Sequence, residues 1–463
     1  MKIKSLGAAE VVTGSCHYIQ TKEDSFLVDC GIFQGETEEK NYELIDCIAE
    51  DIDFVLITHG HLDHVGRLPL LYKQGFRGKI YATKATIDIA KVVLFDAANL
   101  MQEDYITRYK KSLRRGEKAK KPLYEPKDVR DMFKNIEFIE VDYNKKLKLT
   151  KNIQVVFKDA GHILGSSIIK LTIKEGSKKI ITFSGDLGNK HNDILPPPEI
   201  IKKTDYLFCE STYGDRNHKP FKESIKEFRK TILETLKNDG NIIIPSFAIE
   251  RTQEVLCALK DMYKEGLLPK KTQVFLDSPM GIKATNVYVK YHKQLSNKCN
   301  KYLKKDGHIF EFDILKYTTK VDQSKKINEV KKRAIIIAGS GMCNGGRVLH
   351  HLKNRIWDSK NTVLFVGYQA VGTLGRDIVN GEKWIRIYNE DILIQSKIVT
   401  INGFSAHADQ SELLEWIKPM KNNLKTVFLI HGEKEKQEIF KQKIIEKLNL
   451  KTHIVKSKEI IGV

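Results

Sequence analysis

Residues 58–66 read THGHLDHVG, a stretch that places three histidines and an aspartate within six positions. The apolar, β-branched residues just before it predict a buried strand that runs into the loop. Extended backbone points alternate side chains the same way, so His59 and His61 can bind one ion. Asp63 and His64 follow where the chain turns, and we expect them to face a neighbouring second ion. The cluster therefore predicts a metal site.

Four further histidine or carboxylate positions also lie at the ends of predicted strands. They are His162 in DAGHILGS, Asp186 in SGDLGN, His407 in FSAHAD and His431 in LIHGE. Histidines combined with carboxylates suit zinc, although manganese or iron is an alternative. A carboxylate can bridge two ions, and paired ions suit the hydrolysis of phosphate esters. Because these ligands exceed what one ion needs, we predict two ions in each chain.

The composition favours a polyanionic partner in a reducing compartment. The 463 residues carry a formal charge of +19, although a lysine-rich proteome would explain this charge equally well. The basic run at 108–121 is either a solvated surface or a phosphate contact. The seven cysteines show no paired spacing, and the chain lacks a signal-like start or a membrane-spanning apolar run. We expect a cytoplasmic protein that does not enter a membrane.

The order of predicted elements indicates one domain inserted within another. The first two hundred residues alternate short strands, turns and helical segments, as in a layered α/β fold. From about residue 213 the pattern becomes strand, Ser/Gly turn and helix, which is typical of parallel βα units. We predict a first domain over 1–205, an inserted domain over 206–392, and the rest of the first domain over 393–463.

The ordered motifs carry a resemblance to a known family. LVDCG, THGHLDH, GHILGS and SGDLG resemble the motifs of the metallo-β-lactamase superfamily, and ESTYGDR, FSAHAD and LIHGE resemble the extra motifs of its β-CASP nuclease branch. IIIPSFAIERTQE, FLDSPM, SGMCNGGR and GYQAVGTLGR resemble the inserted domain of that branch. The resemblance implies an αββα metallo-β-lactamase sandwich split by a parallel α/β β-CASP domain. It also implies a two-zinc ribonuclease that cuts RNA, expected to be single-stranded, in a cleft between the two domains.

Carried over residue by residue, the resemblance assigns two zinc ions and an acid. One ion takes His59, His61 and His162, the other takes Asp63, His64 and His431, and Asp186 bridges them. Asp29 is expected to orient the THGHLDH loop, as metal-binding histidines commonly require. His407 is expected to protonate the leaving oxygen while Glu210 orients its ring.

Histidine at position 431 favours the RNA branch, because the branch that resembles DNA-repair nucleases typically carries valine there. A DNA nuclease, a small-molecule hydrolase of the superfamily and an RNA-binding scaffold subunit remain the alternatives, and a homodimer is possible. In the inserted domain we expect phosphate contacts at the strand ends. The candidates are Ser246, Arg251, Ser278, Ser340, Arg347 and Arg376.

Overall fold

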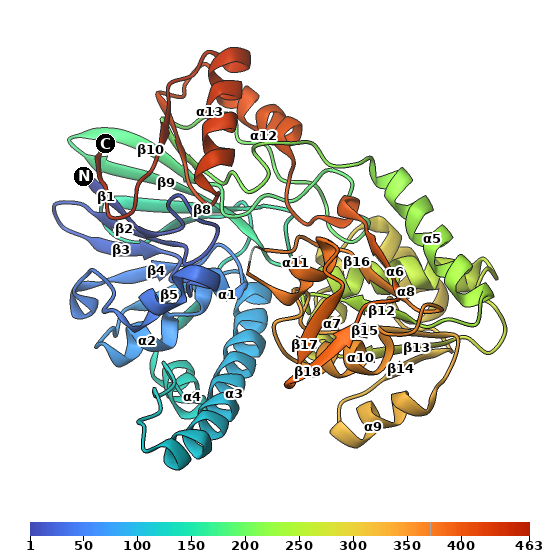
Figure 1. Ribbon diagram of the computed structural model, residues 1–463. Coiled ribbons are helices and arrows are strands. Elements are labelled where there is room, and N and C mark those ends of the chain that lie inside the picture. The colour runs from blue at the N-terminus through green and yellow to red at the C-terminus, as the bar shows by residue number, and fades with distance from the viewer. Residues whose placement is uncertain (371) are drawn as a thin grey trace. The chain divides into compact units, whose positions relative to one another are not determined.

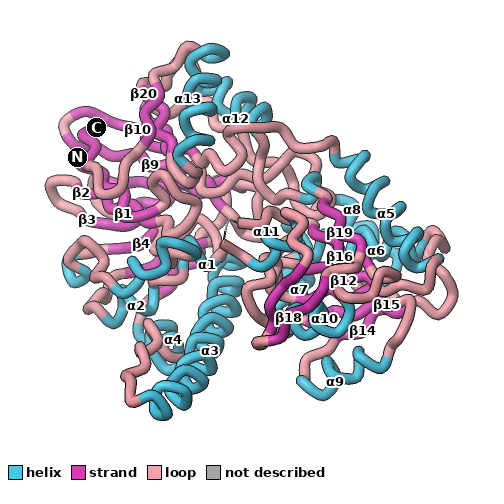
Figure 2. The backbone as a smooth tube through the Cα atoms, in the orientation of Figure 1, coloured by secondary structure: helices cyan, strands magenta, loops and turns pink. Residues whose placement is uncertain are grey.

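The computed structural model describes residues 1–370 and 372–463, and it divides into two compact units (Figures 1 and 2). The first unit comprises 1–190, 197–217 and 407–463, and the second comprises 191–196 and 218–406. The second unit is thus inserted in the sequence of the first, as expected.

The main changes between units occur at 217/218 and 406/407, later than the boundaries expected at 205/206 and 392/393. Strand pairing gives the reason. The strand at Tyr206–Cys209 pairs with two strands of the first unit, and the strand at Lys397–Thr400 pairs within the sheet of the second unit.

Two seven-stranded sheets form the first unit. The strand order of one sheet is β22-β1-β2-β3-β4-β5-β6 and that of the other is β21-β20-β11-β10-β9-β8-β7. The first sheet contains β1 (Lys2–Gly7), β2 (Cys16–Gln20), β3 (Ser25–Val28), β4 (Phe54–Leu56), β5 (Lys79–Ala82), β6 (Phe138–Glu140) and β22 (Ile460–Gly462). The second sheet contains β7 (Lys146–Lys148), β8 (Ile153–Asp159), β9 (Ser167–Glu175), β10 (Ser177–Phe183), β11 (Tyr206–Cys209), β20 (Thr426–Leu429) and β21 (Thr452–Ile454).

Alternating apolar residues pack the two sheets face to face. In β9, Ile169, Leu171 and Ile173 point to the same side and are buried against Phe26 and Phe54 of the other sheet in one apolar cluster. This alternation follows from the period of two in extended backbone. Burial of each such side chain contributes roughly 1.5–3 kcal/mol.

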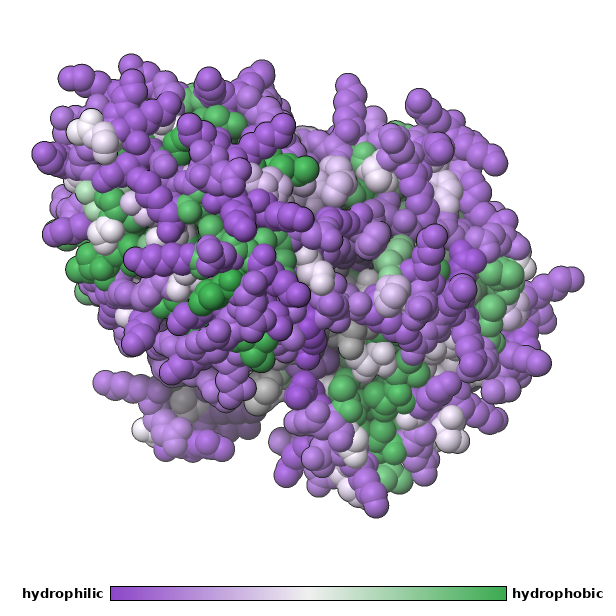
Figure 3. Space-filling view, turned by 90° about the horizontal axis from the view of Figure 1, so that it is seen from above, coloured by the Kyte–Doolittle hydropathy of each residue, from purple (hydrophilic) through white to green (hydrophobic). Residues whose placement is uncertain are grey.

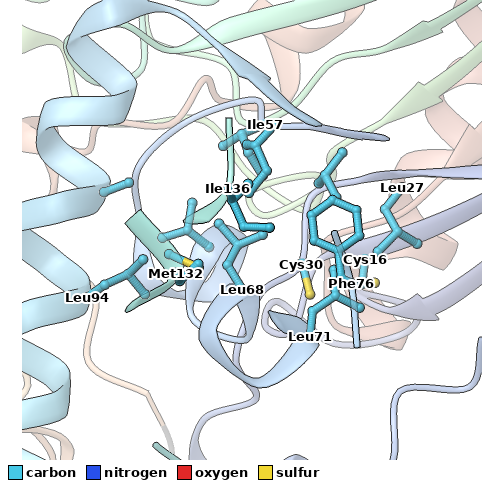
Figure 4. Packing of buried hydrophobic residues seen from close by; sticks show 14 of the residues in the cluster. Cys16, Leu27, Cys30, Ile57, Leu68, Leu71, Phe76, Leu94, Met132 and Ile136 are labelled. Carbon is cyan, nitrogen blue, oxygen red and sulfur yellow. The ribbon is translucent and has the colours of Figure 1, made fainter. Parts of the chain in front are cut away.

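Helices cover the outer face of each sheet, which completes the αββα sandwich. They are α1 (Leu62–Val65), α2 (Leu68–Lys73), α3 (Lys84–Arg115) and α4 (Pro126–Asn135), and later α12 (Gln410–Ile417) and α13 (Lys434–Leu448). Leu68 and Leu71 of α2, Leu94 of α3 and Met132 of α4 pack on the first sheet, as Figure 4 shows. The helices α12 and α13 pack on β11 and β20 of the second sheet.

A six-stranded parallel sheet forms the centre of the second unit, in the order β14-β13-β15-β12-β16-β19. Its strands are β12 (Ile242–Pro245), β13 (Gln273–Asp277), β14 (Leu315–Tyr317), β15 (Ala334–Ala338), β16 (Thr362–Phe365) and β19 (Lys397–Thr400), with a separate hairpin of β17 (Trp384–Ile387) and β18 (Glu390–Leu393). The central strands β12, β15 and β16 are buried along their whole length, because helices cover both faces of a parallel sheet.

The helices of the second unit are α5 (Phe221–Lys237), α6 (Arg251–Lys264), α7 (Pro279–Lys290), α8 (Asn297–Asp306), α9 (Val321–Lys326), α10 (Arg347–Arg355) and α11 (Leu374–Val379). One face of the sheet packs with α10, α11 and the hairpin in a single apolar cluster. Short 3₁₀ helices occur in both units, at Gly35–Tyr42, Ala49–Asp51, His292–Gln294, Ile327–Glu329, Asn402–Phe404 and Lys418–Met420. The fold class expected from the motifs is confirmed.

Hydrophilic side chains dominate the face of the molecule seen in Figure 3, with apolar residues gathered in smaller patches. Among the helices of the described residues, none combines the length and the apolar composition that a bilayer span requires.

Candidate metal centre

The candidate ligands lie in turns that follow the carboxyl ends of strands in the first unit. The strand β4 leads into residues 58–64, β10 leads to Asp186 and β20 leads to His431. Because β10, β11 and β20 lie side by side and run parallel, the turns after them open at one edge of the sheet. Such an edge is where open α/β sheets bind ligands.

Glycines let these turns approach one another closely. A Cβ atom at Gly31 would lie 1.6 Å from the carbonyl oxygen of Asp63. A Cβ atom at Gly188 would lie 1.8 Å from the carbonyl oxygen of Gly161, next to His162. Any other residue at either position would push a ligand-bearing turn out of place.

The first group of ligands consists of His59, His61, His162 and Asp186. The Nδ1 atom of His61 lies 3.1 Å from Nε2 of His59 and 3.2 Å from Nε2 of His162. The Oδ2 atom of Asp186 lies 3.5 Å from Nε2 of His59 and also 3.5 Å from Nε2 of His162. Three imidazole nitrogens and one carboxylate oxygen therefore converge.

The second group consists of Asp63, His64 and His431. The Nε2 atoms of His64 and His431 are 3.3 Å apart, and Oδ2 of Asp63 lies 3.5 Å from Nε2 of His431. Residues separated by more than 360 positions in the chain thus meet at one point.

Asp186 has one carboxylate oxygen toward each group. Its Oδ2 faces the first group, while Oδ1 lies 3.4 Å from Nε2 of His64 and 3.6 Å from Nδ1 of His431. Oδ1 is buried without a hydrogen-bond partner among the described residues. Nitrogen ligands bound tetrahedrally at 2.0–2.1 Å are about 3.3–3.4 Å apart, close to the spacings seen here. The donor set and its geometry therefore fit a metal centre, with Asp186 between its two groups of ligands.

Hydrogen bonds to the opposite ring nitrogens orient the histidines. Nδ1 of His64 lies 2.7 Å from Oδ2 of Asp29, whose Oδ1 accepts the backbone N–H of Thr58 at 2.8 Å. The Oγ1 of Thr58 lies 3.1 Å from Nδ1 of His59, and that of Thr212 lies 3.1 Å from Nδ1 of His431. Asp29 lies where a loop-orienting residue is expected. Thr58 and Thr212 were not predicted, although both lie within the quoted motifs.

Burial and charge set the ionisation of the ligands. Burial lowers the pKa of His59 well below its ordinary value and lowers the pKa of His61 to about 4. Burial opposes ionisation of Asp186, but the neighbouring His431, His64 and His59 hold the pKa of its carboxyl well below the ordinary value. For His64 the effect of burial is outweighed by Asp186 and Asp29, which raise its pKa well above the ordinary value. A metal ion would displace this proton, because neutral imidazoles and ionised carboxylates are the forms that bind metal.

A histidine–carboxylate pair lies beside the first group. Nδ1 of His407 is 3.2 Å from Oε1 of Glu210, and the rings of His407 and His162 have centroids 4.5 Å apart. Burial disfavours a charged imidazole, but Glu210 reverses this effect and raises the pKa of His407. Glu210 is fully buried and also accepts the backbone N–H of Leu187 at 2.6 Å. The carboxylate is therefore fixed in place.

In the second unit, the serine candidates lie at the carboxyl ends of the parallel strands, as expected. The Oγ of Ser278 caps α7 by accepting the N–H of Gly281, and it lies 3.3 Å from the position a Cβ would take at Gly339. Ser246 bonds Thr252, and Ser340 accepts the N–H of Asn344.

Two of the three arginine candidates are used inside the unit. Arg347 donates to Asp277 at 2.7 Å and to the carbonyl oxygens of Thr318 and Thr319. Arg251 is buried and pairs with Glu254. Both guanidinium groups therefore have carboxylate partners within the unit, and their contact with phosphate stays a prediction. Arg376 is half-buried near the start of α11, and it remains a candidate for a phosphate contact.

Three domain families match the chain in order. The metallo-β-lactamase superfamily domain matches residues 18–206, the β-CASP domain matches 252–378, and the Zn-dependent metallo-hydrolase RNA specificity domain matches 391–455.

Curated relatives match nearly the whole chain. Ribonuclease TTHA0252 of Thermus thermophilus is 36% identical over 94% of this chain and 94% of its own length. Transcription termination factor FttA is 31% identical in Methanocaldococcus jannaschii, over 97% of this chain, and 30% identical in Methanosarcina mazei, over 100% of this chain. Both FttA matches cover 71% of the relative.

A crystal structure of a protein of unknown function from Enterococcus faecalis aligns with a TM-score of 0.52 and 13% identity. The alignment covers 100% of this chain and 99% of that one, and it shows a likeness of fold alone. The ordered domain matches and the long alignment to ribonuclease TTHA0252 establish the family. The chain belongs to the β-CASP branch of the metallo-β-lactamase superfamily.

Proposed function

We propose that the chain is a two-zinc ribonuclease that hydrolyses phosphodiester bonds of RNA. The observation that carries this proposal is the position of Asp186, whose two oxygens each face one group of histidines. These residues would hold two ions, and a pair of ions would suit attack at phosphorus because it stabilises both the entering and the leaving oxygen.

In this proposal His59, His61 and His162 hold one zinc ion, Asp63, His64 and His431 hold the other, and Asp186 contacts both. When bound, the metals supply an acidified water and positive charge at the phosphate. Asp29 acts through His64: its carboxylate fixes the ring so that Nε2 points to the centre. The fully buried Thr58–Asp29 hydrogen bonds keep the loop from relaxing.

His407 is the proposed general acid. Glu210 contacts the Nδ1 side of its ring, and in this proposal Nε2 holds the proton for the departing ribose oxygen. A departing alkoxide is a poor leaving group without a proton, so a positioned acid accelerates this step.

RNA is favoured over DNA as the substrate. His431 carries the histidine that marks the RNA branch of the family, and it lies within the second ligand group. The relatives named as a ribonuclease and as transcription termination factors, together with the RNA specificity domain at 391–455, point in the same direction.

The test is incubation of the purified, zinc-loaded protein with single-stranded RNA labelled either at an end or internally. We expect cleavage of RNA and little or no cleavage of a DNA strand of the same sequence. Mapping of the products gives the mode of attack.

Asp186→Asn is the matched control, because it keeps the size of the side chain but weakens one ligand of each ion. It should lose cleavage and bound zinc together. Equal cutting of DNA would replace the RNA assignment with the DNA alternative, and full cleavage by the Asp186→Asn variant would exclude the two-metal arrangement.

A further inference from the structure

An exposed aromatic ring lies at the open edge of the sheet in the second unit. Phe247 is 38% exposed, although every other residue from 240 to 260 is buried. It follows β12, the strand between β15 and β16, so the turns after three adjacent parallel strands surround it. The ring is therefore open to solvent within an otherwise buried segment.

Two glycines pack against one part of this ring. A Cβ atom at Gly341, after β15, would lie 2.7 Å from Cδ2 of Phe247. A Cβ atom at Gly367, after β16, would lie 3.4 Å from Cε2 of the same ring. At Gly341 the backbone thus approaches the ring as closely as only glycine allows, whereas Gly367 lies at ordinary contact distance.

Hydrogen bonds hold this arrangement rigid. The buried side chain of Gln369 donates from Nε2 to the carbonyl oxygens of both Gly341 (3.0 Å) and Gly367 (3.2 Å). The carbonyl oxygen of Phe247 accepts both the N–H (3.1 Å) and the Oγ1–H (2.7 Å) of Thr252. A ring fixed in this way loses little conformational entropy when a ligand stacks on it.

A polar group without a partner lies at the same place. Nε of Arg251 is buried and has no hydrogen-bond partner among the described residues, and the side chain is only 7% exposed. It lies 3.9 Å from the Cβ position of Gly367, the glycine that contacts Phe247. The site therefore offers a flat apolar surface together with an unused donor.

We propose that Phe247 is a stacking platform for one unpaired base of the RNA substrate, bordered by Gly341, Gly367 and Arg251. A planar nucleobase matches an exposed ring that has rigid backbone beside it, and stacking of one base on an aromatic side chain contributes roughly 1–3 kcal/mol. The proposal rests on the proposed function, because it takes single-stranded RNA as the ligand.

The test measures binding of a fluorescent single-stranded RNA to the full chain in the Asp186→Asn background, which prevents turnover. Phe247→Leu keeps apolar volume but removes the ring, and it should weaken binding on the order of 10-fold to 100-fold. Phe247→Trp should bind as well as the parent. Trp357→Leu is the matched control, since Trp357 is 53% exposed in the same unit, and it should leave the affinity unchanged.

A second arm replaces the bases of the RNA one at a time with abasic sites. One position should weaken binding to the parent and have no further effect in Phe247→Leu, which identifies the stacked base as a coupled pair. If no position shows this coupling, or if Phe247→Leu binds like the parent, the platform is excluded. This holds even if Phe247→Leu folds poorly, because the abasic scan of the parent and of Phe247→Trp must still locate one sensitive base. Cleavage of DNA in place of RNA would overturn the proposed function but not the coupling, so the two failures are distinguishable.

Discussion

The position of His407 is compatible with two roles, that of a proton donor and that of a metal ligand, because it contacts Glu210 and also lies near His162. If it donates a proton, His407→Ala should slow RNA cleavage by about 10²–10⁴-fold and leave the zinc content unchanged. The His407→Ala variant should cut an activated aryl phosphodiester, whose leaving group needs no protonation, almost as fast as the parent does. Rates on both substrates and metal analysis give the answer.

Glu210→Ala is the natural companion in this experiment. Two residues that act as one unit are not additive, so the second substitution should cost little once His407 is gone. Loss of zinc from His407→Ala, or equal slowing of the activated ester, would make His407 a ligand or a structural residue instead.

Glu250, at the turn before α6, links the stability of the second unit to pH. It accepts hydrogen bonds from Asn192 (2.8 Å) and Tyr288 (2.5 Å). Burial first, and then the neighbouring Glu254, raise its pKa to about 8. Between about pH 4.5 and pH 8 the folded state retains this proton and the unfolded state does not. The contribution of the Glu250 carboxyl to the free energy of unfolding is therefore fully present below about pH 4.5. It then declines by up to about 1.4 kcal/mol per pH unit as the pH approaches 8.

Glu250→Gln removes this titration, so its thermal stability relative to the parent should improve steadily from pH 5 to pH 8. Melting curves across this range, with the exposed Glu382→Gln as a control, measure the trend. A difference between Glu250→Gln and the parent that stays constant with pH would show that the carboxyl is ionised in the folded protein.

At the scale of elements, α3 carries the basic run that the sequence left open between a solvated surface and a phosphate contact. The helix continues to Arg115 and ends at Gly116, which has the positive φ of 68° that favours glycine there. Lys110, Lys111, Arg114 and Arg115 are exposed on its last turns. The charges therefore belong to a helix end in the first unit.

If this helix end contacts RNA, replacing these four residues with glutamine should weaken binding and flatten its dependence on salt. A single-stranded RNA releases about 0.7 counterions per phosphate contact, so the log–log slope should fall by up to about 3. Binding measured between 50 and 300 mM salt provides the slope. An unchanged slope would assign the run to solvated surface.

Part of the metal centre could be predicted from the sequence because it depends on the local geometry of a single strand and its turn. His59 and His61 were paired from their spacing alone, because a period of two is a local property of extended backbone. That Asp186 faces both groups depends on β10, β11 and β20 lying side by side, and no local pattern reports such pairing. The motif resemblance supplied that part.

Long-range packing also sets features that no local sequence pattern reports. Arg347 has the sequence context of a phosphate contact, and in the fold its guanidinium donates a hydrogen bond to the buried Asp277. The same carboxylate also forms a hydrogen bond with His351. The first boundary is expected at 205/206, yet the strand that follows it, β11, pairs with β20 of the first unit. Both outcomes depend on contacts between distant residues.

At the scale of the whole molecule, the inserted unit divides the metal centre in sequence. The residues after 406 supply His407, His431 and the strands β20–β22, and β22 pairs with β1 at the other end of the chain. The first unit therefore completes its fold and its ligand set only once its last segment is present. The three domain matches follow the same division of the chain, with the β-CASP domain at 252–378 between the matches at 18–206 and 391–455.

Titration of zinc into metal-free protein tests whether two metal ions act together on RNA. RNA cleavage and bound zinc are measured in the same samples. We predict that cleavage stays low at one ion per chain and reaches its maximum at two, because Asp186 lies between two groups of ligands. Full cleavage at one ion per chain, or at none, would contradict it.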